Sequence, residues 1–347
     1  MRRNDRLKHR RRGPVIRTSN RHACRPLLQP ETVVTTDPPA SWPSRHAKAL
    51  AFRALHARAD GFIVPNPWDV GSARLLAGLG FEALATTSAG YAFSRGVPDN
   101  CVPREALMAH LAEIAAATHL PVTADLENGF GDAPEVVART LRLAADAGVV
   151  GGSIEDARSG PGDRLYAREF AAERIRAAVE AARSLPFPFV LTARAENYRV
   201  GQPDLADTIA RLQAYQEAGA DVLFAPGLIR PQDIATVVRS VDRPVNVMLG
   251  DPCLELGAPE LAQLGVRRIS VGALLTRAAF GEFLRAASEL REHGSASYAR
   301  AAVSGAELGR CFAPYARGGV MTSAPGIAQR PAPVPTIHIQ ETRWTTC

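Results

Sequence analysis

Short apolar runs alternate with longer amphipathic segments between residues 47 and 313 of the chain. Eight of these runs have the length and the apolar, often β-branched, content of buried parallel strands. They cover residues 62–65, 83–87, 122–126, 152–155, 189–193, 222–225, 245–249 and 268–272. A strand signal followed by a helix signal, repeated eight times, predicts an α/β protein of the (β/α)8 TIM-barrel class.

Amphipathic segments between the runs predict helices, the clearest at 103–118, 133–147, 167–185 and 203–218. Several segments end in glycine, the usual residue for stopping a helix in the left-handed conformation. Pro103 suits the first turn of its helix. An open doubly wound sheet is the alternative fold, but no GxGxxG motif follows the first strand.

Residues 274–313 predict two further amphipathic helices after the last strand, more than barrel closure needs. Residues 314–347 are rich in Pro, Gly and Ser, and residues 1–46 are basic. We therefore expect a catalytic barrel domain at 47–313 with its C-terminal helices, between two disordered tails.

The net charge of +6 comes from one end of the chain. Residues 1–30 hold ten Lys and Arg and a single acid, and the remainder carries 31 basic and 34 acidic side chains. Nucleic-acid binding by the barrel is therefore not expected. The basic tail itself reads as a solvated extension, with a transit-type presequence or a polyanion contact as alternatives.

The apolar runs and the cysteines indicate where in the cell the protein is expected. No run approaches the roughly 18 apolar residues of a membrane-spanning helix, so we expect no membrane association. The five cysteines are scattered and lack CxxC spacing, which argues against disulfides or zinc and favours a cytoplasmic enzyme.

Charged side chains gather where consecutive predicted strands end. Asp125 and Glu127 follow the third strand, Glu155 the fourth, and Arg194 ends the fifth. In a barrel these ends meet at one mouth, and crowded carboxylates repel one another unless a cation lies among them. Oxygen ligands alone favour Mg²⁺, with Mn²⁺ as the alternative. Each carboxylate taken singly could instead cap a helix or pair with an arginine.

Two other features suit a substrate site. The backbone at Ser88, Ala89 and Gly90, after the second strand, could bind a carboxylate, or simply form a tight turn. Arg194 could be a bidentate clamp on a carboxylate or a structural ion pair.

Eight segments together resemble the isocitrate lyase/phosphoenolpyruvate mutase superfamily. They are 65–69, 87–90, 96–99, 124–131, 151–156, 192–194, 218–224 and 244–247. The chain looks most similar to the phosphoenolpyruvate mutase-like (carboxyvinyl-carboxyphosphonate phosphorylmutase-like) branch.

The resemblance implies roles for individual residues. The family's acidic pair falls on Asp125 and Glu127, with Glu127 as the direct Mg²⁺ ligand, although the family has Asp there. Glu155 and Asp99 would support metal-bound water. The substrate-binding Ser-Gly pair falls on Ser88 and Ala89, the substrate arginine on Arg194, and a pocket position on Asn246. A homotetramer is implied, in which a C-terminal helix packs on a neighbouring subunit.

The implied activity is cleavage or rearrangement of a C–C or C–P bond in a small α-oxo or α-hydroxy acid, through an enolate. We favour a lyase or decarboxylase; a phosphonomutase and a catalytically inactive barrel acting as a binding protein are the alternatives. Lyases of the family carry a proton-donating cysteine in the loop after the fourth strand. Here no cysteine occurs between Cys101 and Cys253, so isocitrate and methylisocitrate cleavage is not expected. Other candidate acids in this loop are Arg158, Ser159, Asp163, Arg164 and Tyr166.

Overall fold

A computed structural model describes residues 42–158, 165–250 and 254–316. Its eight parallel strands are β1 (Phe62–Val64), β2 (Leu84–Ala85), β3 (Val122–Asp125), β4 (Gly151–Glu155), β5 (Val190–Arg194), β6 (Val222–Phe224), β7 (Val245–Met248) and β8 (Arg268–Ser270). They lie within two residues of the predicted runs, and the barrel prediction is confirmed.

The pairing order runs β1-β8-β7-β6-β5-β4-β3-β2. The first and last strands pair in parallel, which rules out the open doubly wound sheet. β1 and β2 are not paired as strands, but the Ala85 amide donates to the Pro65 carbonyl at 3.0 Å and nearly closes the barrel.

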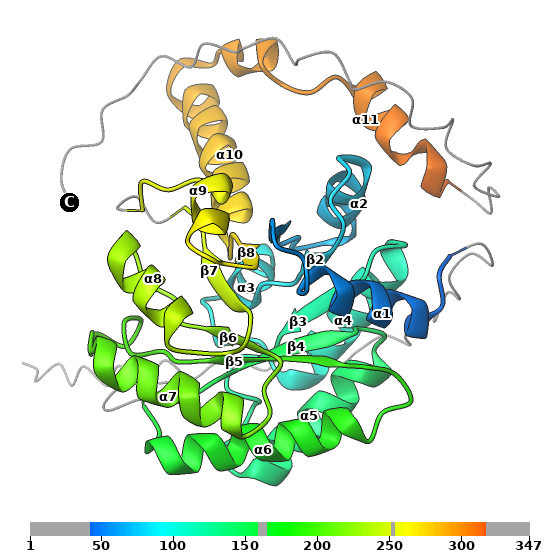
Figure 1. Cartoon of the computed structure of the whole chain (residues 1–347). Helices are drawn as coiled ribbons and strands as arrows, with labels where there is room; N and C mark the ends of the chain where they lie inside the picture. The colour runs from blue at the N-terminus through cyan, green and yellow to red at the C-terminus, as the bar shows by residue number, and fades with distance from the viewer. Residues whose placement is uncertain (1–41, 159–164, 251–253, 317–347) are drawn as a thin grey trace, which may run out of the picture. The chain divides into compact units, whose positions relative to one another are not determined.

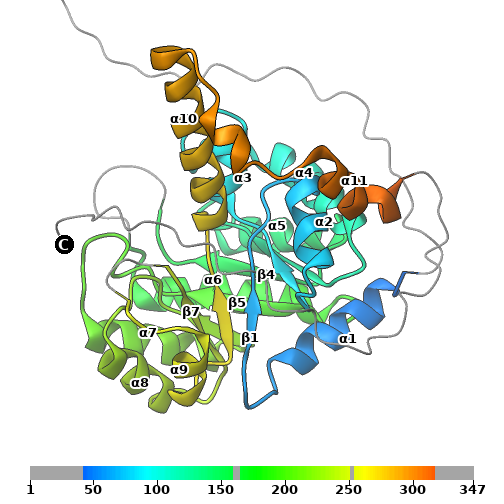
Figure 2. The same cartoon turned by 90° about the horizontal axis from the view of Figure 1, so that it is seen from above.

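The helices are α1 (Arg45–Leu55), α2 (Val70–Gly78), α3 (Ser88–Ser94), α4 (Arg104–Ala117), α5 (Pro134–Asp146), α6 (Arg168–Arg183), α7 (Leu205–Glu217), α8 (Pro231–Arg239), α9 (Ala258–Gln263), α10 (Leu274–His293) and α11 (Gly305–Phe312). Two 3₁₀ turns, η1 (Ser297–Arg300) and η2 (Ala313–Tyr315), flank α11. Helices α5 to α8 lie outside strands β4 to β6 (Figure 1), and α2 packs against α4 (Figure 2). Pro103 precedes α4 as its cap instead of lying in its first turn.

Helix α1 begins slightly before the predicted domain boundary at residue 47. Ser44 caps α1 by accepting a hydrogen bond from the Ala47 amide at 3.2 Å, so the helix begins at Arg45. Both predicted tails fall almost wholly outside the described residues, so their disorder stays a prediction.

Helix α1 covers the N-terminal ends of the strands. Its Phe52 is fully buried and forms an edge-to-face pair with Phe62 at the start of β1, with ring centroids 6.2 Å apart. A Cβ atom on Gly151, at the start of β4, would come within 3.0 Å of the Phe52 ring. The barrel is thus closed at this end, and its opposite end is left for a site.

The two predicted C-terminal helices are present as α10 and α11. Thr276 is the one buried residue of the 20 in α10. Phe283 is 68% exposed and Leu284 is 62% exposed, so a large apolar face is uncovered. None of the described helices is both long and apolar enough to span a membrane.

Candidate metal and substrate site

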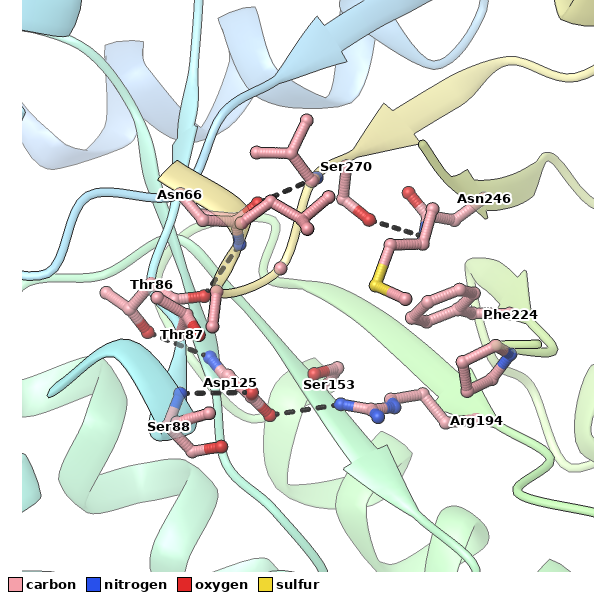
Figure 3. A pocket seen from close by; sticks show the side chains of 18 of the residues that line it. Asn66, Thr86, Thr87, Ser88, Asp125, Ser153, Arg194, Phe224, Asn246 and Ser270 are labelled. Atoms are coloured by element: carbon pink, nitrogen blue, oxygen red, sulfur yellow. Dashed lines mark hydrogen bonds and ion pairs between the residues drawn. The ribbon is translucent and has the colours of Figure 1, made fainter. Parts of the chain in front are cut away.

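A cavity of about 470 Å³ opens at the C-terminal ends of the strands. Residues from the ends of all eight strands or the loops that follow them line it, and Figure 3 shows how they converge. Among the described residues its charged lining consists of Asp99, Asp125, Glu155, Arg194, Arg199, Arg268 and Arg277. The predicted position of the site is therefore where the cavity lies.

Asp125 is held from both sides at the end of β3. One carboxylate oxygen accepts a hydrogen bond from the Ser88 amide at 3.2 Å, and the other accepts from Arg194 at 3.2 Å (Figure 3). The Asp125 amide donates to the Thr86 hydroxyl at 3.0 Å, which fixes the strand end against the β2 loop. Thr87 caps α3 by accepting from the Gly90 amide, and this directs the Ser88 amide toward the carboxylate.

Arg194 joins three carboxylates. Its Nη1 lies 2.8 Å from Glu155 and 3.2 Å from Asp125, and its Nε lies 2.8 Å from Glu196. Burial acts to lower the pKa of the guanidinium, but these carboxylates outweigh burial and raise the pKa above its ordinary value. Of the two alternatives left by the sequence, the ion pair is present, and a direct clamp on substrate stays a prediction. Glu196 was not anticipated.

Glu127 is set apart from the other predicted ligands. It has a left-handed backbone (φ 51°), is 5% exposed, and lines a neighbouring groove with Asn128 and Asp132 instead of the main cavity. Burial, followed by the negative charges of Asp125 and Asp99, raises the pKa of Glu127 to about 8. Burial likewise raises the pKa of Glu155, although Arg194 opposes this.

Within the described ranges, no three Asp, Glu, His or Cys side chains are placed as a ready set of metal ligands. The donor chemistry nevertheless fits a hard cation. Asp125 and Glu155 both face the cavity, and they share one nitrogen of Arg194 as their positive partner. Burial, then the charges of Asp125 and Asp99, raise the pKa of Glu127 more than Arg194 lowers it, so a cation nearby would favour the ionised carboxylate. Oxygen donors of this kind suit Mg²⁺.

Arg174 holds the loop that carries Glu127. From α6 its guanidinium donates to the carbonyls of Asn128, Gly131, Asp132 and Glu155, with 2.9 Å to Asp132 and 3.1 Å to Glu155. Sequence reasoning missed it. The sequence did contain a sign of this role, because an arginine among the buried alanines of an amphipathic helix has to find hydrogen-bond acceptors inside the protein.

Of the predicted substrate residues, Ser88, Ala89 and Asn246 line the cavity and Gly90 does not. A Cβ atom on Gly90 would lie 2.5 Å from Thr87 and 2.6 Å from the Thr276 hydroxyl. Close packing of α3 against α10 therefore accounts for glycine at this position.

The loop after β4 turns away from the cavity where it is described. Arg158 pairs with Asp132 at 3.3 Å, and the buried Tyr166 hydroxyl donates to Asp132 at 2.6 Å while accepting from Asn128 at 3.2 Å. Tyr166 does not line the cavity. The candidate acids at 159, 163 and 164 lie outside the described residues.

Asn66 was also missed, although it bridges the two sides of the opening in the barrel. Its amide nitrogen donates to the Thr86 carbonyl at 2.9 Å, and its amide oxygen accepts from the Val271 amide at 3.0 Å (Figure 3). Arg199, Arg268 and Arg277 are the remaining charged residues of the lining that sequence reasoning did not single out.

A family model, curated relatives and solved structures all match this chain to the same group of lyases and mutases. The family model described as phosphoenolpyruvate phosphomutase matches residues 52–291. A probable 2-methylisocitrate lyase of Corynebacterium glutamicum is 31% identical over 261 residues, which cover 73% of this chain and 83% of the relative.

Two solved structures extend the comparison. A protein of Burkholderia cenocepacia, provisionally described as a lyase/mutase, is 60% identical with a TM-score of 0.76, covering 78% of this chain and 96% of the other. Phosphonopyruvate hydrolase in complex with oxalate and Mg²⁺ is 25% identical with a TM-score of 0.68, covering 77% and 95%.

Proposed function

Because the chain belongs to the phosphoenolpyruvate phosphomutase family of lyases and mutases that act on small oxo acids, we propose that it is a magnesium-dependent lyase. It would break a C–C bond of a small 2-oxo or 2-hydroxy carboxylic acid. The observation that carries this proposal is the pair Asp125 and Glu155, which share one nitrogen of Arg194 at the wall of the cavity.

Asp125, Glu127 and Glu155 would hold the metal, with Asp99 orienting water beside it. The complex of phosphonopyruvate hydrolase with Mg²⁺ supports this ion, and Mn²⁺ would suit the same donors. When bound, the metal would act as a Lewis acid on the oxygens of the substrate. Its charge would also oppose the burial and the carboxylate repulsion that now raise the pKa of Glu127.

Protein groups would bind the substrate and stabilise the negative charge that develops as its bond breaks. The backbone at Ser88 and Ala89 would bind the substrate carboxylate, Asn246 would position the substrate from β7, and Arg194 would stabilise the oxygen that receives the electron pair as the bond breaks. Arg194 already forms ion pairs with three carboxylates, which leaves it less capacity to bind a fourth. We therefore assign it to charge stabilisation more than to substrate capture.

The charge of the cavity suits an anionic substrate. Four arginines lie in its lining among the described residues, beside the carboxylates that would hold the cation. A bound divalent cation would add positive charge and favour a small acid over a neutral molecule.

The absence of a cysteine in the loop after β4 favours a leaving fragment that needs no thiol acid. Tyr166 already donates its proton to Asp132, so it is not free to act. Loss of carbon dioxide from an oxaloacetate-like acid meets this condition.

The test is a panel of oxaloacetate, phosphonopyruvate, methylisocitrate and substituted malates, each with Mg²⁺ and with EDTA. Metal-dependent turnover of an oxo or hydroxy dicarboxylic acid is expected. Conversion of phosphonopyruvate to phosphoenolpyruvate, without turnover of the other acids, would establish the second candidate, a phosphonomutase. Metal binding without turnover of any member would favour an inactive barrel with a binding role.

We further propose that the chain forms a homo-oligomer, with a tetramer as the expected state, and that it is cytoplasmic. The uncovered apolar face of α10, which includes Phe283 and Leu284, supports assembly. Light scattering at micromolar concentration that gave only a monomer would contradict the proposed assembly.

A further inference from the structure

Arg268 lies inside the barrel beneath the proposed metal site. It is the first residue of β8 and 5% exposed, and it contributes to the lining of the cavity. Its Nη1 donates to the Thr192 hydroxyl of β5 at 2.8 Å, so the side chain crosses the interior between the two strands. Its guanidinium carbon is 5.8 Å from the centroid of the Phe52 ring, which closes the barrel below it.

No carboxylate of the described residues lies within ion-pair distance of Arg268, in contrast to the other arginines buried in the barrel's ionic clusters. Arg194 has three such partners, and Arg211 has two, Asp156 and Asp207. Nε of Arg268 is buried without a hydrogen-bond partner. Burial, with the charge of Arg194 added, lowers the pKa of Arg268 to about 10. A buried guanidinium without a counter-ion is costly, which is why such groups are normally paired.

The free part of this guanidinium is the part suited to a carboxylate. Nη1 is used by Thr192, while Nε and Nη2, which form the parallel pair of donors along one edge, make no hydrogen bond with the described residues. Two parallel N–H groups match the two oxygens of a carboxylate. Asn246, beside Arg268 in register on β7, also lines the cavity and has a buried amide oxygen without a partner. That oxygen could accept a hydrogen bond from a water or a hydroxyl group beside the carboxylate.

We propose that Arg268 binds the second carboxylate of a small dicarboxylic acid in the depth of the cavity, while the first carboxylate lies at the metal end, beside Ser88 and Ala89. This inference rests on the proposed function, which assigns the metal end of the cavity. It adds a binding role for Arg268 at the deep end. It explains why a charged side chain occupies the barrel interior without a protein counter-ion: the substrate is the counter-ion.

Calorimetric titration with three dicarboxylates in the presence of Mg²⁺ tests the assignment. Malonate and succinate carry a second carboxylate at a distance from the first, whereas both carboxylates of oxalate can be held at the metal alone. Arg268→Met should weaken malonate or succinate binding at least tenfold and change oxalate binding less than twofold. Arg268→Lys, which keeps the charge without the paired donors, should fall in between. Arg267→Met is the matched control, because Arg267 neighbours Arg268 on the chain but does not line the cavity.

Thermal melting of the same variants separates this role from a structural one. Without ligand, Arg268→Met should melt at or above the temperature of the wild type, because an unpaired buried charge is removed. Malonate or succinate should then raise the melting temperature of the wild type more than that of the variant. A variant that melts lower but binds malonate and succinate like the wild type would overturn the inference, as would equal weakening of all three acids.

The two proposals can fail separately. Binding of malonate or succinate that depends on Arg268, without turnover of any member of the substrate panel, would refute the lyase proposal and leave the dicarboxylate subsite standing. Metal-dependent turnover with a KM unchanged by Arg268→Met would refute only the subsite.

Discussion

Replacing Glu127 by Gln keeps the shape of the side chain but removes a carboxylate that is 5% exposed. Burial and the charges of Asp125 and Asp99 raise the pKa of Glu127 to about 8, whereas an unfolded chain leaves a glutamate near ~4.3. The folded protein therefore binds this proton more tightly than the unfolded chain does. The stability that results is fully present below the unfolded pKa and is lost as the pH rises toward 8.

The size of the effect follows from the two pKa values. One unit of difference corresponds to ~1.4 kcal/mol, so raising the pH from about 5 to about 8 should cost the metal-free wild type about 3 kcal/mol relative to Glu127→Gln. His56 and His110 act in the opposite direction. Burial lowers their pKa values to about 3 and about 4. The stability that the two neutral histidines contribute is therefore lost as the pH falls below the pKa of an unfolded histidine, which is about 6.5. Both histidines are present in both proteins, and their effect cancels in the comparison.

Urea denaturation of the two proteins in EDTA, at both pH values, measures this difference. Mg²⁺ should then stabilise the wild type at the higher pH and the variant much less, because a cation favours the charged carboxylate. If the stability difference between wild type and Glu127→Gln is the same at both pH values, the burial argument is wrong. If Mg²⁺ stabilises both proteins equally, Glu127 is not a metal ligand.

Four further tests address other parts of the protein. Arg194→Lys keeps the charge but loses the planar fork that joins three carboxylates, so kcat/KM should fall by the equivalent of ~2–4 kcal/mol in steady-state kinetics; an unchanged value would make the ion pair purely structural. Arg174→Met removes the donors to four backbone carbonyls and should lower the free energy of unfolding by about 2–4 kcal/mol, with faster hydrogen exchange at 128–132. Protected amides there would contradict its positioning role. Isocitrate and methylisocitrate should yield no useful amount of succinate in an enzymatic assay, and robust release would require an acid that replaces the missing cysteine. Phe283→Glu should shift light scattering toward smaller species, whereas an unchanged mass would remove α10 from the interface.

Several parts of this protein could be predicted from the order of residues alone. Apolar runs of strand length separated by amphipathic segments placed all eight strands, because a parallel strand buried on both faces needs such a run wherever it lies. The same logic located the site, since the ends of parallel strands in a closed barrel meet at one mouth. Asp125, Glu155 and Arg194 end consecutive strands, and their meeting in the cavity followed from that topology.

The partners within the site depended on the tertiary structure. Arg194 meets Asp125 across 69 positions of the chain, and Arg268 meets Thr192 across 76. Strand periodicity predicts which side chains point inward, but not which inward atoms come within 3 Å of one another, because that depends on the register and tilt of strands far apart in the chain. For this reason the sequence left open whether Arg194 clamps a substrate or forms an ion pair. The structure shows the ion pairs of Arg194, and it leaves Arg268 buried without an ion-pair partner among the described residues.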